Sequence, residues 1–336
     1  MMDLDAIRDA RSRISAHILS TPLVHSPTLS DICGVPVGLK LEHHQTTGSF
    51  KLRGATNAML MLTEAQRSRG VVAASTGNHG RALAHAARAI GSRATICMSR
   101  LVPENKVAEI RRLGAEVRIV GSSQDEAQQE VDNLVTETGF VMLPPFDHPD
   151  IVAGQGTIGL EIVEAISDVA TVIVPLSGGG LAAGVAAAVK GMRPRAQVIG
   201  VTMERGAAMK ASLDAGRPVQ VEEVLSFADS LGGGIGLDNK VTFAMCRALL
   251  DDVVLLSECE IADGIRHAYR KEREIIEGAA AVGVAALLTG KVAGLRGPVV
   301  LVLSGRNIDM GLHRCVVNGM SNVLGKDFSE PNGDSD

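Results

Sequence analysis

The sequence contains few aromatic residues, and this scarcity limits what the protein can recognise. It has no Trp, one Tyr and six Phe among 336 residues. Proteins that bind single-stranded nucleic acid stack the bases on aromatic side chains, and a duplex requires a clustered basic surface. The formal net charge is −5, and Lys and Arg are dispersed among Asp and Glu. We therefore expect no nucleic-acid partner.

Cysteines and long apolar runs are also scarce. The five Cys are odd in number and have no CxxC spacing, which argues against a disulfide framework or a thiolate metal site. No apolar stretch reaches 18 uninterrupted residues, and the first residues, MMDLDAIRDARSRI, include acidic residues and place no basic segment before an apolar run. Membrane spans and secretory signals require these features. We therefore expect a soluble, cytoplasmic protein without a membrane partner.

The abundant residues are Ala, Val, Leu and Ile, arranged as short β-branched runs between longer Ala-rich helical patterns. Continuous apolar strands of this kind are typical of parallel sheets that are covered on both faces. The alternation predicts an α/β protein, doubly wound. The predicted strands span residues 70–75, 94–98, 115–120, 171–176, 197–202, 252–257 and 298–304.

A Pro-rich polar interruption, LPPFDHPDIVAGQG at 143–156, follows a further predicted strand, FVML at 140–143, and divides the pattern. Breakers of this kind mark loops between units. We predict a larger cofactor-binding lobe made of residues 1–52 and 148–325 and a smaller, mobile lobe made of 53–147. The polar tail at 326–336 is predicted to be disordered.

Three loops that follow predicted strands carry candidate site residues. The segment SGGGLAAG at 177–184 stands between a strand and a helix, and its backbone N–H groups suit a phosphate. The segment ASTGNHG at 74–80 offers short polar side chains at a helix start, and LSGRN at 303–307 places a hydroxyl at a strand end. Taken singly, each loop is equally well explained as an ordinary turn or helix cap.

The glycine segment also has a second interpretation. Gly178, Gly180 and Gly184 form a GxGxxxG pattern, and Glu204 follows the next predicted strand. A dinucleotide-binding unit uses glycines and an acid in this order. A nicotinamide-dependent oxidoreductase is therefore an alternative, although it leaves the other two loops and Lys51 without a role.

Lys51 lies in GSFKLRGA, directly after Phe50, in a small-residue segment that opens a helix. Most single lysines are solvated surface residues, but this one joins a phosphate loop, an Asn and a neutral hydroxyl. Together these are the groups needed to hold pyridoxal 5'-phosphate, with Lys51 bonded to the cofactor aldehyde and Phe50 packed near the ring.

The four motifs GSFKLRGA, ASTGNHG, PLSGGGLAAG and LSGRNID occur in the order and approximate spacing of the fold-type II pyridoxal-phosphate enzymes. The sequence resembles their threonine/serine dehydratase branch. This resemblance implies the tryptophan synthase β-like fold, with two doubly wound lobes of parallel or mixed sheet and the site between them. It also implies a lyase that removes water and ammonia from a β-hydroxy amino acid, and relatives suggest a homodimer.

The resemblance also implies roles for individual residues. Lys51 would carry the cofactor and exchange a proton at Cα, and Ser304 would face the pyridine nitrogen. Asn78 would hold the ring hydroxyl, with Glu277 of IIEGAAA near the ring. The phosphate would lie against Ser177, Gly178, Gly179, Gly180 and Leu181, and the substrate carboxylate against Ser75, Thr76 and His79.

Some positions depart from the family pattern. Arg306 replaces the usual Gly or Ala and is expected to reach the substrate or reshape its pocket. Relatives that bind a divalent cation use a Glu, a backbone carbonyl and an Asp as its ligands. If Glu204 is the first of these ligands, the position of the Asp is occupied by Lys210, so no metal site is predicted. His43 and His44, with SGRNIDM, are similar to dehydratases of hydroxyectoine utilisation. As neighbours on a strand they would point to opposite faces. They could then not readily ligate one metal, and at most one would face the site.

Two further alternatives stay open within this family. A racemase of the same fold needs a proton donor opposite the lysine, and Thr76 has the required hydroxyl but adds a methyl group. A non-catalytic cofactor-binding sensor is the other, with Arg306 preventing turnover.

Overall fold

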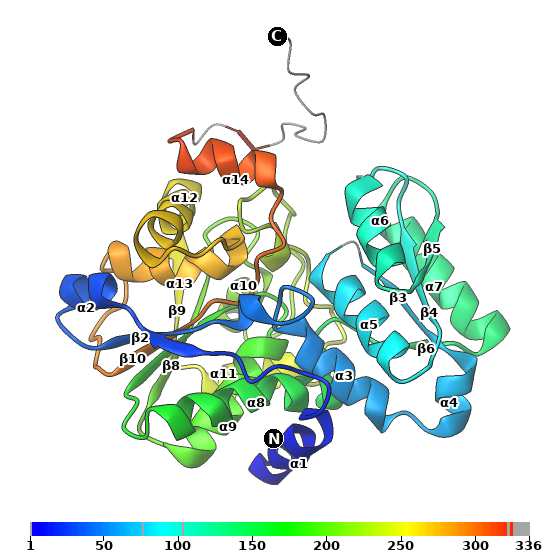
Figure 1. Cartoon of the computed structure of the whole chain (residues 1–336), viewed down its shortest axis with the longest axis horizontal. Helices are drawn as coiled ribbons and strands as arrows, with labels where there is room; N and C mark the ends of the chain where they lie inside the picture. The colour runs from blue at the N-terminus through cyan, green and yellow to red at the C-terminus, as the bar shows by residue number, and fades with distance from the viewer. Residues whose placement is uncertain (1, 76, 103, 321–322, 325–336) are drawn as a thin grey trace.

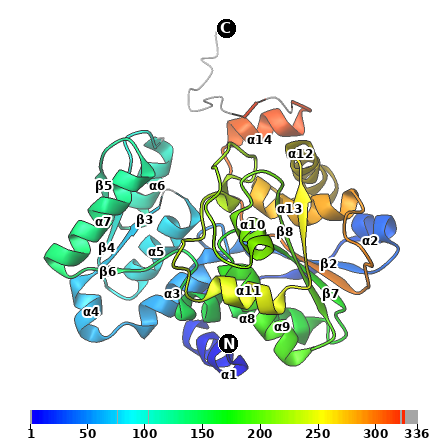
Figure 2. The same cartoon turned by 180° about the vertical axis from the view of Figure 1, so that it is seen from behind.

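A computed structural model describes residues 2–75, 77–102, 104–320 and 323–324. Two sheets lie side by side, as Figure 1 and the reverse view in Figure 2 show. The larger sheet has the strand order β1-β2-β10-β7-β8-β9, in which only β1 is antiparallel to its neighbour. Its strands are β1 (Leu23–His25), β2 (Val37–Lys40), β7 (Thr171–Pro175), β8 (Gln197–Met203), β9 (Asp252–Leu256) and β10 (Val299–Val302).

The smaller sheet is wholly parallel and has the order β5-β4-β3-β6. Its strands are β3 (Val71–Ala74), β4 (Ala94–Met98), β5 (Glu116–Ile119) and β6 (Val141–Met142). All eight strands predicted from the apolar runs, FVML among them as β6, are confirmed. The pattern missed β1 and β2, because both are short and β1 lies at the edge of the sheet with two of its three residues exposed.

Helices cover both faces of each sheet. They are α1 (Leu4–Ile14), α2 (Pro27–Cys33), α3 (Lys51–Met61), α4 (Glu64–Arg69), α5 (Asn78–Ala89), α6 (Glu104–Arg112), α7 (Gln124–Thr138), α8 (Pro149–Ala165), α9 (Gly180–Met192), α10 (Ala208–Ala215), α11 (Thr242–Leu249), α12 (Glu258–His267), α13 (Gly278–Leu288) and α14 (Met310–Val317). Short turns of 3-10 helix form η1 (Glu42–His44) and η2 (Asp229–Leu231), and η3 (Ala268–Glu272) is a π-helix.

The alternation along β10 shows why the larger sheet is buried on both sides. Val299 and Leu301 pack into a core with α12 and α13, whereas Val300 and Val302 pack into a second core with α8 and α9. Successive side chains of a strand point to opposite faces, so a continuous apolar run serves two cores. The smaller sheet repeats this arrangement with α5 on one face and α7 on the other.

Helix α3 joins the two sheets, because it packs against α8 of the larger unit and α5 of the smaller one. Glycines permit the close contact. A Cβ atom on Gly154 of α8 would lie 2.7 Å from the Arg53 carbonyl oxygen, and one on Gly54 of α3 would lie 2.8 Å from that of Ile151. The lobe boundary predicted at residue 53 therefore falls inside a continuous helix, and the predicted disordered tail at 326–336 lies outside the described residues.

None of the helices described here is long and apolar enough to cross a membrane.

Candidate active site

A cavity of about 510 Å³ lies where the carboxyl ends of strands from both sheets meet. This volume falls in the range of small-molecule sites. Residues after β3, β7 and β10 line it, together with the first residues of α3 and α13. In parallel sheets ligands bind at this edge, so the fold brings together the three loops and the lysine that the sequence singled out.

Lys51 is the first residue of α3, and its amine faces the cavity. Its Nζ donates a hydrogen bond to the Pro145 carbonyl oxygen at 2.8 Å and lies 5.3 Å from the centre of the Phe50 ring. Burial lowers the pKa of the amine to about 8, although the Glu277 charge acts in the opposite direction. An amine with this pKa is partly neutral near pH 8, which is the form that reacts with an aldehyde.

Two asparagines from distant segments, Asn78 and Asn307, meet at the Glu277 carboxylate. Asn78, the first residue of α5, donates from Nδ2 to Glu277 Oε1 at 2.7 Å. Its Oδ1 accepts from Asn307 Nδ2 at 2.6 Å, and the Asn307 backbone N–H donates to Glu277 Oε2 at 3.1 Å. The two Asn side chains are thereby fixed in one orientation.

Glu277 lies at the start of α13 and is almost fully buried, with 4% of its surface exposed. Burial raises the pKa of its carboxyl to about 7, and the charge of Asp229 adds to this, while the Asn78 and Asn307 hydrogen bonds oppose it. Gly305 packs directly against the carboxylate, since a Cβ there would lie 2.5 Å from Oε1. A larger residue at position 305 would displace the carboxyl group.

The glycine segment connects β7 to α9. Gly179 has φ 90°, a left-handed conformation that favours glycine. A Cβ on Gly178 would meet the Phe146 ring at 2.4 Å. The following helix contributes N–H groups that lack intrahelical partners. The cavity lining includes this whole phosphate loop, namely Ser177, Gly178, Gly179, Gly180 and Leu181.

Ser304 follows β10 and also lines the cavity, with its carbonyl oxygen accepting from the Phe50 N–H at 3.0 Å. The chain there is bridged to the Lys51 segment, because Ser49 pairs with Gly305 and the Arg306 N–H donates to the Gly48 carbonyl. This pairing fixes the distance between the lysine loop and the strand end.

The side chain of Arg306 is exposed, and it is not among the described residues that line the cavity. Its backbone N–H is bonded to the Gly48 carbonyl oxygen. Contact between Arg306 and the substrate stays a prediction.

The loop after β3 contributes Ser75 and His79 to the lining. Ser75 Oγ accepts from the Gly80 N–H at 3.1 Å, and His79 Nε2 lies 2.8 Å from the Leu143 carbonyl oxygen. Burial and the Lys51 charge lower the pKa of His79 to about 4, so its ring is neutral. Thr76 lies outside the described residues.

Sequence reasoning missed several residues of the cavity. Asn307 stands in the quoted LSGRN motif, but its contact with Asn78 joins positions 229 residues apart. Asp229 and Arg81 also line the cavity. Their positions carry no local signal, because only the tertiary fold places η2 and the second turn of α5 against the same space.

The expectation that His43 and His44 lie on a strand and point to opposite faces was wrong. They lie in the 3-10 turn η1, not on a strand, and both rings reach the same carboxylate. The Nε2 atoms lie 2.8 and 3.0 Å from Glu274 Oε2. Neither histidine is among the described residues that line the cavity.

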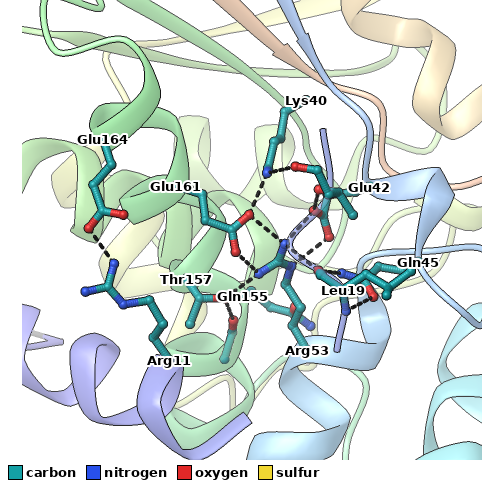
Figure 3. Close-up of polar contacts among 12 residues, drawn as sticks. Arg11, Leu19, Lys40, Glu42, Gln45, Arg53, Gln155, Thr157, Glu161 and Glu164 are labelled. Atoms are coloured by element: carbon teal, nitrogen blue, oxygen red, sulfur yellow. Dashed lines mark hydrogen bonds and ion pairs between the residues drawn. The ribbon is translucent and has the colours of Figure 1, made fainter. Parts of the chain in front are cut away.

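A buried ionic cluster around Arg53 holds α3 against neighbouring elements, as Figure 3 shows. The Arg53 guanidinium donates from Nε and Nη2 to both oxygens of Glu42 at 2.8 Å. It also donates to Glu161 at 2.6 and 2.9 Å, and Lys40 Nζ lies 2.5 Å from the same carboxylate. These bonds connect β2, η1, α3 and α8 two residues beyond Lys51.

The cavity fits the groups of pyridoxal phosphate. A buried amine with a lowered pKa suits the aldehyde, and a glycine loop at a helix start suits the phosphate. Asn78 suits the ring hydroxyl, and Ser304 provides a neutral hydroxyl for the pyridine nitrogen.

Known proteins resemble this chain along most of its length. A family model described as "Pyridoxal-phosphate dependent enzyme" matches residues 14–305. A Sinorhizobium fredii protein named "Putative threonine dehydratase" is 68% identical, covering 97% of this chain and 98% of that protein. An L-threonine ammonia-lyase of Thermotoga maritima is 42% identical over 95% of this chain and 79% of its own length. The structure of maize serine racemase matches with a TM-score of 0.88 and 32% identity, covering 92% and 95% of the two chains.

These matches also decide between the two interpretations of the glycine segment at 177–184. The family model includes this segment and describes a pyridoxal-phosphate protein, so the dinucleotide interpretation with Glu204 is set aside. The chain belongs to the pyridoxal-phosphate dependent enzymes, within the threonine dehydratase family and with its fold-type II α/β architecture.

Proposed function

We propose that the protein is a threonine or serine dehydratase, which eliminates water from the amino acid and releases ammonia. One observation carries this proposal: the Lys51 amine, with a pKa lowered to about 8, faces a cavity that also contains the glycine loop. The names of the most similar relatives support threonine as the substrate.

The chain's residues divide the work. Ser177, Gly178, Gly179, Gly180 and Leu181 bind the phosphate of the cofactor, and Asn78, held by Glu277, orients its ring. When bound, pyridoxal phosphate stabilises negative charge at the substrate Cα. Lys51 takes the Cα proton, and its partly neutral amine at pH 8 is suited to this transfer.

The remaining groups hold the substrate and choose the outcome. The substrate carboxylate binds to Ser75, Thr76 and the N–H groups at the start of α5. The uncharged ring of His79 lies beside them and contacts the substrate. Ser304 carries no charge, so it does not hold a proton on the pyridine nitrogen. Charge at Cα would then be short-lived, which favours loss of the β-hydroxyl over transamination; the proton that Lys51 takes from Cα and the β-hydroxide together make up the water that leaves. The enamine that leaves the enzyme hydrolyses to the 2-oxo acid and ammonia.

A substrate screen tests this proposal. The cofactor-loaded protein, freed of unbound cofactor, is incubated with L-threonine, L-serine, 3-hydroxyaspartate and amino acids derived from hydroxyectoine. We expect ammonia and an equal amount of 2-oxo acid from at least one of them, and none from Lys51→Ala. Cofactor binding without ammonia release from any substrate would contradict the proposal and support a sensor role.

The hydroxyectoine substrates are included because His43, His44 and SGRNIDM are similar to dehydratases of that breakdown route. We propose a role there only as a choice of substrate for the same elimination. Higher turnover of the derived amino acids than of threonine would support it. We also propose a homodimer, which sedimentation velocity tests directly.

Racemisation is the second candidate, because the likeness to maize serine racemase extends over 92% of this chain. The same incubations resolve it by chiral separation of the remaining serine. Formation of D-serine faster than ammonia would make racemisation the main activity.

A further inference from the structure

A second cluster of chemically active side chains lies outside the cavity. His43 and His44 occupy η1, and Glu274 follows the π-helix η3. Both Nε2 atoms point at one oxygen of Glu274, at 2.8 and 3.0 Å, and the two rings are 4.3 Å apart at their centres. The proposed dehydratase reaction gives none of these three residues a role.

The geometry resembles that of a metal site. One ligand atom from each residue lies within 4.8 Å of the others. Ligand atoms around a tetrahedral zinc ion, bound at about 2.0–2.1 Å, are roughly 3.3 Å apart. The distances of 2.8 and 3.0 Å between carboxylate and imidazole therefore need only a small expansion to admit an ion.

We propose that His43, His44 and Glu274 bind a divalent transition-metal ion, with Zn²⁺ as its simplest representative. Two imidazoles and one carboxylate form a donor set that zinc uses with a water in the fourth position. Imidazole ligands favour Zn²⁺ and its neighbours over Mg²⁺ and Ca²⁺, which prefer oxygen.

The backbone presents the three groups unusually. The 3-10 turn brings neighbouring imidazoles to one carboxylate, which a strand could not do. Before Glu274, Arg273 has φ 65°, the one positive φ outside glycine among the described residues. Such a conformation costs free energy and recurs where function requires it. His44 is 36% exposed and Glu274 20%, so an ion can enter from solvent.

The site is connected to the cavity by two short backbone routes. The His43 N–H donates to the Leu303 carbonyl oxygen at 2.9 Å, directly before Ser304. Glu274 stands three positions before Glu277, whose carboxyl binds Asn78. An ion that fixes Glu274 therefore steadies two segments of the cavity wall without touching substrate.

Zinc uptake tests the proposal. The cofactor-loaded protein, without an affinity tag, is treated with a chelator and exchanged into buffer free of unbound pyridoxal phosphate, which binds metals itself. Zn²⁺ is then titrated against a chromophoric chelator, and Co²⁺ is used to record the visible bands of four-coordinate cobalt. We expect one tight equivalent and a rise in unfolding temperature with Zn²⁺.

Three variants make the test specific. His44→Ala removes a half-exposed ligand and Glu274→Gln keeps the size of the side chain, so both should fold. We expect each to bind Zn²⁺ at least about tenfold more weakly, by comparison with the effect of losing a partner around a metal. His85→Ala, on α5, removes a histidine outside the cluster and should bind as the wild type does.

Failure has a clear form. Wild-type protein that takes up no Zn²⁺, or that binds it equally well after Glu274→Gln, overturns the proposal. Uptake that disappears in both cluster variants and persists in His85→Ala supports it. Both outcomes are independent of ammonia release, so the proposed dehydratase activity is tested separately.

Discussion

Two buried cations on the first turn of α3 have opposite surroundings. Arg53 is surrounded by carboxylates of Glu42 and Glu161, and these neighbours outweigh burial and raise its pKa. Lys51, two residues earlier, donates only to a carbonyl among the bonds described for it, and burial lowers its pKa to about 8. The first turn of α3 therefore holds one charge, on Arg53, that neighbouring carboxylates stabilise, and one, on Lys51, that burial disfavours.

The carboxylates of the two regions differ in the same way. Burial acts to raise the pKa of Glu42, but Arg53 and Lys40 lower it below the ordinary value. Burial raises the pKa of Glu277 to about 7, because its partners are amides and a backbone N–H instead of a cation. The ion pairs of Arg53 thus keep their groups charged, whereas the surroundings of Lys51 and Glu277 bring the pKa values of both groups close to neutral pH.

The largest expected effect is that of Lys51→Met. Ammonia release should fall by roughly 10³-fold or more, since the group that exchanges the Cα proton is gone. Urea unfolding of the cofactor-free variant should occur at the same or higher urea than that of the wild type, because a costly charge is removed. Appreciable residual turnover would contradict the role of Lys51.

The difference in stability between Lys51→Met and the wild type should depend on pH in a direction that the pKa of Lys51 sets. The folded pKa of about 8 lies below the ordinary value of 10.5, so the unfolded chain binds more protons between them. The contribution of Lys51 to stability therefore rises with pH from about 8 to 10.5. The stability advantage of Lys51→Met should be full at pH 7 and absent above pH 10.5.

Arg53→Met should lower the stability of the protein by disrupting the buried ion pairs of Arg53. It removes the guanidinium from the buried Glu42 and leaves Glu161 with Lys40 alone, and removing one partner of a buried pair costs about 3–5 kcal/mol. Urea unfolding measures this loss. The matched control is Arg11→Met, which removes an exposed pair with Glu164 and should cost below about 1 kcal/mol. Equal losses for both variants would contradict the assignment.

Glu277→Gln should reduce ammonia release by about 10–100-fold, because the amide cannot accept from both Asn78 and the Asn307 N–H as the carboxylate does. In the wild type the folded state binds more protons between the ordinary pKa of 4.5 and the folded value of about 7. Stability of the cofactor-free protein should thus fall as pH rises through this range, by on the order of 3 kcal/mol at most. Glu277→Gln should lack this fall in stability. A pH profile of stability equal to that of the wild type would contradict the raised pKa of Glu277.

The smallest effect is expected from Gly305→Ala. The added Cβ lies 2.5 Å from Glu277 Oε1 and must move the carboxyl group. We expect about a tenfold loss of kcat/KM through misplacement, with the protein still folded. Gly234→Ala is the control, because no atom lies within 4 Å of its Cβ; its stability should change by less than about 0.5 kcal/mol. Equal kcat/KM for both variants would refute the proposed contact.

Local patterns explain what could be predicted. Apolar runs located every strand of the smaller sheet, including the two-residue β6 within FVML. They failed for β1 and for the three-residue turn at His43 and His44, because so short an element shows no periodicity. Spacing along the chain also does not reveal which way the turn after the Ser49–Gly305 bridge presents the Arg306 side chain, which is exposed.

The sequence by itself determined the α/β class, the four motifs and the family, since these depend on residue order and on chemistry at strand ends. Only the tertiary structure decided which partners those residues meet. Asn78 and Glu277 are 199 residues apart, and His44 and Glu274 are 230 apart. The burial that sets the pKa of Lys51 and Glu277 also arises only when both lobes close around the cavity, because desolvation depends on every neighbouring segment at once.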